Sequence, residues 1–169
     1  MPKVKYEFKE LRRLNRNLQT LAKDAEKVMK FSLYDGAKIA ADELRTSVDD
    51  LARVTDAEAI QAWMTRTPSL ISVSQKNGLR NGLGISPMKV GPNLKIHVKV
   101  GFSGYNEVVT HRWPNGQPNV MIAASCEHGS SAMLEQPFIR TAYVSCAGRV
   151  VKQMKETAKK EISEILDEI

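Results

Sequence analysis

The longest regular pattern in the chain is a three-to-four-residue spacing of apolar positions, which is typical of helices. In residues 7–30 it forms a narrow stripe flanked by arginines and lysines. The stripe consists of Leu11, Leu14, Leu18, Leu21, Ala25 and Val28. Asp24 has the chemistry of an N-cap, so a short helix, a break near residues 22–24 and a longer second helix are predicted. The stripe either packs on its own domain or forms a seam between subunits.

From Asp35 the helical pattern continues, and a long helix is predicted to end near residues 51–53. Its apolar face consists of Ala37, Ala40, Ala41, Leu44, Val48 and Leu51. The small residues at 36, 37, 40 and 41 allow another helix or a sheet to approach closely. Thr55 and Glu58 have the spacing of a capping box, which predicts a short helix through Trp63. Residues 65–72 are expected to form a loop.

The last predicted helix runs from Phe138 to about Glu168, directly after Pro137. Proline suits this place because its fixed φ is already helical and its missing N–H would have had no partner there. The apolar stripe of this helix is predicted to consist of Val144, Ala147, Val151, Met154, Ala158, Ile162 and Ile165. A shorter helix, opening at Pro118 and ending at Gly129, is expected to precede it.

Between the helical stretches lie short runs of β-branched and apolar residues. Residues 83–90 and 94–102, joined by Gly-Pro-Asn at 91–93, indicate an antiparallel hairpin, and a turn or two of helix is expected at 74–81. In the second run apolar and polar positions alternate, which predicts one buried and one wet, basic face. The apolar positions are Ile96, Val98 and Val100, and the polar ones are Lys95, His97 and Lys99. The pattern predicts an α+β fold: N-terminal helices, a small antiparallel sheet, and a long C-terminal helix packed on the sheet.

Length and composition indicate one globular domain over residues 1–169, with 42% apolar and 26% charged residues. Residues 1–30 are expected to form a helical N-terminal extension of that domain. No run of about 18 apolar residues occurs, so no membrane span is expected. The N-terminus lacks the apolar core of a secretion signal, so none is inferred.

The net charge of +6 is unevenly distributed. Residues 1–30 hold nine Lys/Arg against four acids, and residues 61–120 hold seven against Glu107 alone. Residues 31–60 hold seven acids against three bases. These blocks are either ordinary solvated surfaces or complementary faces between segments or subunits.

Cysteine and histidine chemistry is the weaker candidate. Cys126 and His128 are two residues apart, so on a helix they point in different directions and do not form a metal site. Cys126 and Cys146 are expected to be reduced, and no local signature supplies either with a base. The glycine-rich residues 78–84 lack the Lys-Ser/Thr of a phosphate loop. No enzyme activity, metal or cofactor is predicted; a hydrolase using one of the two cysteines remains a third hypothesis.

A basic surface is the stronger candidate, because cations attract nucleic acid without reading its sequence. Aromatic residues near cations, here Tyr105 and Trp113, are typical of single-strand binders. The candidate cations for a DNA channel or an interface are Lys95, Lys99, Arg112, Arg12, Arg13 and Arg16. A basic, nonspecific DNA-binding accessory protein is therefore an alternative function.

Several segments, in a fixed order, carry a family resemblance. They are Asp35-Gly-Ala-Lys-Ile-Ala-Ala-Asp42, Gly78-Leu-Arg80, Gly82-Leu-Gly-Ile-Ser-Pro87, Val98-Lys-Val-Gly-Phe-Ser-Gly-Tyr-Asn106, Gly116-Gln-Pro-Asn119, Glu127-His-Gly-Ser130 and Gln136-Pro-Phe-Ile-Arg140. Together they resemble the lambdoid-type neck or tail-completion proteins of long-tailed bacteriophages, often described as minor tail components. The resemblance spans about residues 30–160. Its most specific residues are Glu127, Gly129, Ser130, Pro137, Phe138 and Arg140.

The chain departs from the family pattern in two places. Thr141-Ala142 stands where the family commonly has Pro-Ala. Residues 54–72 look like an insertion that the family pattern does not require.

The resemblance implies a non-enzymatic structural subunit of the virion. Such proteins form a ring of identical subunits around the DNA channel, between the head and the tail tube. Their expected partners are further copies of the chain, the head-closure or connector protein, and the tail terminator or tail tube, with nonspecific DNA contact and no membrane. Within this chain, residues 127–142 are expected to fix the C-terminal helix against the sheet, while residues 129–135 stay available to a neighbour.

Overall fold

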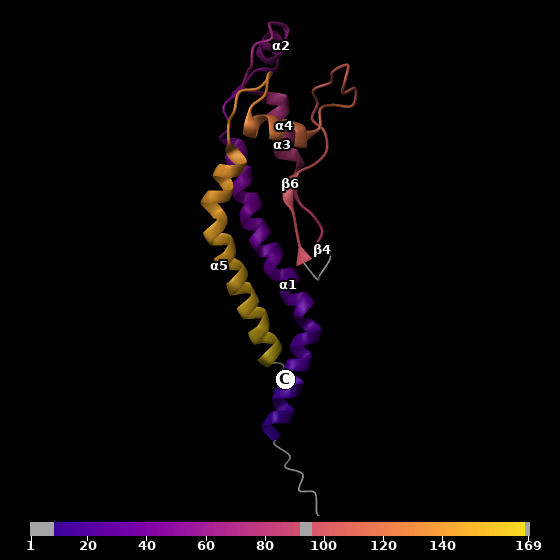
Figure 1. The fold of residues 1–169 in the computed structure, drawn as a ribbon, viewed down its shortest axis with the longest axis vertical. Coiled ribbons are helices and arrows are strands. Elements are labelled where there is room, and N and C mark those ends of the chain that lie inside the picture. Colours follow the sequence, from indigo (N-terminus) through magenta and orange to yellow (C-terminus); the bar gives the residue numbers. More distant parts are fainter. Residues whose placement is uncertain (1–8, 92–95, 168–169) are drawn as a thin grey trace, which may run out of the picture.

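The computed structural model describes residues 9–91 and 96–167, and it has the predicted α+β class. Two long helices run antiparallel, the short helices gather at one end of them, and the strands β4 and β6 lie alongside α1 (Figure 1). The helices are α1 Lys9–Asp49, α2 Asp56–Met64, α3 Val73–Gly82, α4 Asn119–His128 and α5 Phe138–Asp167. The strands are β1 Arg53–Val54, β2 Ile71–Ser72, β3 Leu83–Ile85, β4 Lys89–Val90, β5 Ile96–His97 and β6 Val100–Phe102.

The first helix is continuous, so the predicted break near residues 22–24 is wrong. Asp24 lies within α1, and its neighbours Ala22, Lys23, Ala25 and Glu26 all favour or tolerate helix. With no glycine or proline there, nothing in the backbone interrupts the helix. Its end at Asp49 is two to four residues earlier than predicted.

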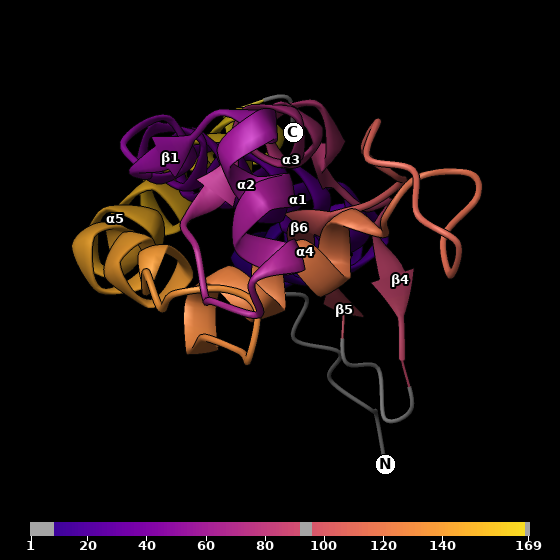
Figure 2. The same cartoon turned by 90° about the horizontal axis from the view of Figure 1, so that it is seen from above.

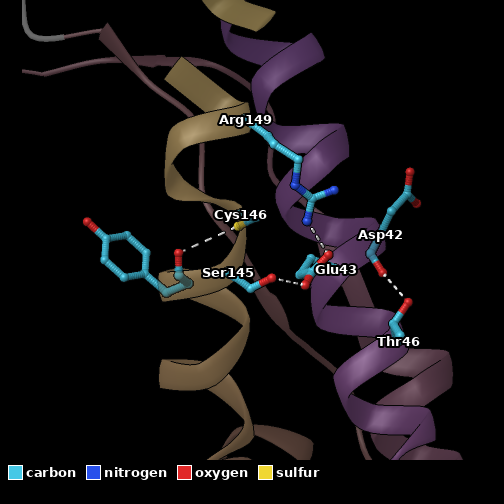
Figure 3. Close-up of polar contacts among 7 residues, drawn as sticks. Asp42, Glu43, Thr46, Ser145, Cys146 and Arg149 are labelled. Atoms are coloured by element: carbon cyan, nitrogen blue, oxygen red, sulfur yellow. Dashed lines mark hydrogen bonds and ion pairs between the residues drawn. The ribbon is translucent and has the colours of Figure 1, made fainter. Parts of the chain in front are cut away.

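The close approach expected at the small residues of α1 is confirmed. Gly36 is buried, and Met154 and Val150 of α5 lie directly against it, where the two helices run side by side (Figures 1 and 2). Polar side chains also join the two helices. Thr157 donates its hydroxyl to Asp35 over 2.7 Å. Figure 3 shows Ser145 and Arg149 reaching from α5 to the Glu43 carboxylate of α1.

The buried face of α5 differs from the predicted stripe. Val144 is 71% exposed, and Val151 and Ile162 are also exposed, whereas Ile165 is buried as predicted. The buried residues of α5 are Phe138, Ala142, Cys146, Thr157 and Ile165. Ala147, Met154 and Ala158 of the predicted stripe are half-buried, and Met154 lies against Gly36 of α1, so the hydrophobic spacing predicted only part of the buried face.

The hairpin is confirmed, and its turn falls partly on residues 92–95, outside the described residues. β3 pairs with β6 in the register Leu83↔Phe102, and β4 pairs with β5 in the register Lys89↔His97, both antiparallel. Lys99 is exposed, but Ile96, His97, Val98 and Val100 are all half-buried, so the two faces are less distinct than predicted. Lys95 lies outside the described residues.

Two further features of the strands come from long-range contacts. Met88 donates its backbone N–H to the hydroxyl of Tyr34, which ties the hairpin to α1. β1 and β2 form a short parallel pair, Arg53↔Ile71, where residues 65–72 were expected to be loop throughout. Seen from above, α5 lies on one flank and the β4–β5 hairpin on the other, with α1 between them (Figure 2).

The core lies where α1, α3, α4 and the first turns of α5 meet. Its most buried side chains are Val48, Ile71, Leu79, Asn119 and Cys126. Phe102 of β6 meets Phe138 of α5 with ring centroids 5.8 Å apart, so α5 reaches the sheet through its first turn. The rest of α5 packs along α1.

Both predicted caps of the short helices are present. Thr55 and Glu58 form the capping box of α2, and the φ of +70° at Gly129 ends α4 as predicted. In the ranges 9–91 and 96–167 no helix combines the length and the apolar character needed to cross a bilayer.

Candidate functional site

Glu127 supplies the cap of α5 from the end of α4. Its side chain is buried, with the residue 8% exposed. One carboxylate oxygen accepts the backbone N–H of Ile139 at 2.7 Å, and the other accepts that of Arg140 at 2.9 Å. These N–H groups lie in the first helical turn, where no backbone carbonyl is available to them. A carboxylate there also interacts favourably with the positive end of the helix dipole.

The loop between Glu127 and α5 is held at several points. Gly129 takes a positive φ, a conformation that glycine adopts without strain. The Ser130 hydroxyl accepts the N–H groups of Ala132 (3.3 Å) and Met133 (3.0 Å). Leu134 donates its N–H to the Ser69 carbonyl over 2.8 Å. Residues 130–132, 134 and 135 are exposed, so this part of the loop is accessible, as the sequence predicted.

The chain turns from α4 into α5 over residues Glu127–Arg140, which we call the Glu127–Arg140 corner. Gln136 joins this corner to the end of α1. Its N–H donates to the carbonyl of Cys126 at 2.7 Å, and its side-chain amide donates to the carbonyl of Ala52 at 3.1 Å. Phe138 follows in the core at 5% exposure. The Glu127–Phe138 segment therefore sets the direction in which α5 leaves α4.

Arg140 and Thr141 have exposed side chains, and each makes a hydrogen bond in or near the first turn of α5. The Arg140 side chain is exposed, so the structural contact of this residue is its backbone N–H. Thr141, where the family commonly has proline, donates its hydroxyl to the Pro137 carbonyl. The hydroxyl of Thr141 thus finds a partner within the first turn of α5.

An open apolar groove of about 520 Å³ lies beside this corner, and we call it the α4–α5 groove. Its lining residues are Phe102, Val120, Ala123, Ala124, Glu127, His128, Ile139, Arg140 and Tyr143. Val120, Ala124 and Tyr143 are exposed. The Glu127 carboxylate is engaged with the backbone of α5, and His128 and Arg140 are the basic side chains at the rim. This volume is within the range of ligand-sized clefts, and the lining suits an apolar group.

The cysteine candidates are both buried. Burial, with a smaller contribution from the neighbouring Glu127 charge, raises the pKa of the Cys126 thiol to about 11. This thiol is therefore protonated at neutral pH, whereas the thiolate is the nucleophile. Cys146 faces α1, with its sulfur 3.8 Å from the Tyr143 carbonyl. Among residues 9–91 and 96–167, no three His, Cys, Asp or Glu side chains are grouped as metal ligands would be.

The candidate DNA-contacting cations do not form one surface. Arg13 and Arg16 are exposed near the N-terminal end of α1. Arg12 is on the same helix, but its side chain is not among those that the structure describes. Lys99 is exposed just before β6. Arg112 lies 5.6 Å from the Trp113 ring, in the connection between β6 and α4. That connection and the N-terminal end of α1 are at opposite ends of the molecule (Figure 1).

The structure adds a residue that the sequence pattern did not indicate. Lys76 is buried, and its ammonium donates to the carbonyls of Asp49 (2.7 Å) and Leu51 (2.8 Å), where α1 ends. Burial and the charge of Arg53 lower the pKa of this lysine. No local signal could have revealed its role, because the carbonyls come from a segment 25 and 27 residues earlier.

The exposed apolar face of helix α2 is a second feature that the sequence analysis did not single out. None of the residues of α2 is buried, so its apolar side chains are open to a partner. Ile60, Trp63 and Met64 are exposed, and Trp63 is 74% exposed. Their i, i+3, i+4 spacing places them on one helical face, a signal that the sequence did contain. We call these three residues the α2 ridge.

Comparisons with protein-family models, with curated proteins and with solved structures found no match to this chain.

Proposed function

We propose that this protein is a structural subunit of the neck or tail of a long-tailed bacteriophage, which completes the tail or joins it to the head. The observation that carries the proposal is the Glu127–Arg140 corner. The motif residues that resemble the tail-completion family have a structural use here. Glu127 caps α5, Gly129 ends α4 and Phe138 packs in the core. This use suits an assembly protein whose contacts depend on the relative placement of two helices.

The distribution of exposed apolar side chains supports a joining role. The N-terminal turns of α1 extend past the last turn of α5 (Figure 1) and expose Leu14 and Leu18, at 54% and 56%. The α2 ridge and the α4–α5 groove lie toward the other end. Unpartnered apolar surface commonly marks protein–protein contact sites, and a joining protein requires at least two of them.

We further propose that the subunits form a ring around the DNA channel, between the head-closure or connector protein and the tail terminator or tube. The exposed cations Arg13, Arg16, Lys99 and Arg112 would then meet DNA through phosphate attraction alone. Because these residues lie on separate elements, the alternative of a dedicated DNA-binding accessory protein has less support. A salt-dependent gel shift by the isolated monomer at submicromolar concentration would favour that alternative.

Electron microscopy of phage particles made without this protein tests the proposal. We expect full heads and separate tails, with joining restored when the wild-type chain is supplied. A chain with both Cys126 and Cys146 replaced by alanine should also restore joining if it folds, whereas a hydrolase using either cysteine would lose function. Normal, infectious joined particles in the absence of the protein would refute the proposal.

A further inference from the structure

We propose that the α2 ridge of one subunit docks into the α4–α5 groove of a second copy of this chain. The inference rests on the proposed function, because it describes how identical subunits of an assembly would meet. It begins from two apolar surfaces that are both open in the single chain.

The α2 ridge has the composition of a helix that binds in a groove. Such helices anchor through apolar residues spaced at i, i+3 and i+4, which is the spacing of Ile60, Trp63 and Met64. Tryptophan is enriched among the residues that contribute most to protein–protein binding. Within its own chain α2 is held mainly from its N-terminal end, where Asp56 accepts hydrogen bonds from the N–H (3.0 Å) and hydroxyl (2.7 Å) of Ser74. The ridge therefore projects from a fixed base.

The α4–α5 groove has matching chemistry. Its floor is apolar, with Phe102, Ala123 and Ile139, and its volume of about 520 Å³ can receive more than one side chain. The sequence of α2 contains Asp56 and Glu58 and no basic residue, with Arg66 in the turn that follows. The exposed basic side chains of the rim are His128 and Arg140, while the Glu127 carboxylate of the lining is engaged with the backbone of α5. The apolar surfaces therefore match, and the acidic character of α2 is opposite in sign to the two basic side chains of the rim.

Ridge and groove belong to different parts of one chain, so the contact is heterologous. Each subunit offers one ridge and one groove, and successive copies generate a ring if the rotation closes or an open filament if it does not. A nine-residue helix buries less area than a standard interface. Pairwise association is therefore expected to be weak, and closure of a ring would add to its stability.

Two variants separate the halves of the contact. Trp63→Ala removes the main anchor of the ridge and leaves the groove intact. Ala124→Glu places a charge in the groove and leaves the ridge intact, and Ala124 is exposed, so the fold should tolerate it. The matched controls are Tyr105→Ala, an exposed aromatic residue outside both surfaces, and Asn77→Glu, which places a charge at an exposed position of α3 outside both surfaces.

Sedimentation velocity on the full chain measures the result. We expect wild type and both controls to self-associate, and each of the two variants to weaken association by about 30-fold or more. An equimolar mixture of the two variants should form a heterodimer and nothing larger, because only one intact ridge meets only one intact groove. Unchanged circular dichroism and unfolding midpoints would show that both variants fold.

Three results would overturn the inference: a wild-type chain that stays monomeric up to about 0.5 mM, a Trp63→Ala chain that associates like wild type, or variants that do not combine when mixed. None of these results would refute the head–tail role, which is tested separately by electron microscopy of particles that lack the protein. Conversely, normal joined particles without the protein would refute that role even if the mixed variants form their heterodimer.

Discussion

Gly36 of α1 lies directly against Met154 of α5. A Cβ atom at position 36 would stand 2.6 Å from the Cγ atom of Met154 and 3.2 Å from a methyl carbon of Val150. Cβ atoms do not approach other atoms at 2.6 Å, so any side chain at 36 requires the two helices or Met154 to move. The absence of a side chain at position 36 thereby allows Met154 and Val150 of α5 to lie directly against α1.

Gly36→Leu is expected to destabilise the protein by about 1–3 kcal/mol, because overpacking at the helix contact exceeds the gain in helix propensity. Adding Met154→Ala should recover part of that loss by making room for the new side chain. Urea unfolding of the two single variants and the double variant measures the coupling. Strictly additive effects would show that residues 36 and 154 do not share this space.

Glu127→Ala should lower the free energy of unfolding by about 2–3 kcal/mol. The substitution leaves the N–H groups of Ile139 and Arg140 without their acceptor at a buried helix start. Glu135→Ala is the matched control, since Glu135 is exposed in the neighbouring loop and should change stability by less than about 0.5 kcal/mol. Equal effects of the two substitutions would contradict the capping role.

Phe138→Ala should cost roughly 3–5 kcal/mol, because the ring is buried against Phe102 in the core. The loss is measured by chemical denaturation of the purified chain. If the loss stayed well under about 1 kcal/mol while assembly failed, Phe138 would instead belong to a subunit interface.

The attachment of α2 is expected to weaken in acid. Hydrogen bonds from the Ser72 and Ser74 side chains lower the pKa of Asp56 below its ordinary value of 3.8, and those from Thr55 lower the pKa of Glu58. A carboxyl whose pKa is lower in the folded state stabilises that state above its unfolded pKa. The stabilisation is lost as the pH falls through the folded pKa, which places the loss below about pH 4.

Amide hydrogen exchange of residues 56–64 at pH 5 and pH 3 measures this effect. Exchange rates corrected for intrinsic pH dependence should show lower protection of α2 at pH 3. Asp56→Asn should lower protection already at pH 5 and reduce its dependence on pH, with Glu58 supplying the remainder. Constant protection of α2 in the wild type between the two pH values would count against this prediction.

Features fixed by short-range chemistry were predictable from the sequence. Thr55 and Glu58 gave the start of α2, and Pro118 and Gly129 gave the limits of α4. Features that depend on distant partners were not. The buried face of α5 is determined by its approach to Gly36, and the end of α1 is bonded by Lys76 from α3.

The candidate site shows the same division. Residues 127–142 were predicted to fix the last helix against the sheet, and the contact of Phe138 with Phe102 does so. The Glu127 cap was missed because it depends on how the loop returns the chain, 12 and 13 residues later, to the same carboxylate. The basic residues were grouped only by residue type, and the fold separates Arg13 and Arg16 from Arg112.

Because α1 is one unbroken helix of 41 residues, it measures about 60 Å at 1.5 Å per residue. The distance between the exposed apolar residues Leu14 and Leu18 and the opposite end of α1 is therefore determined by residue count rather than by a flexible joint. Removing two turns from the part of α1 beyond α5 would bring those ends about 10 Å closer and nearly preserve the facing of Leu14 and Leu18. A partner that binds at both ends of α1 would then find its two binding surfaces closer together, although the fold around α5 would be unchanged.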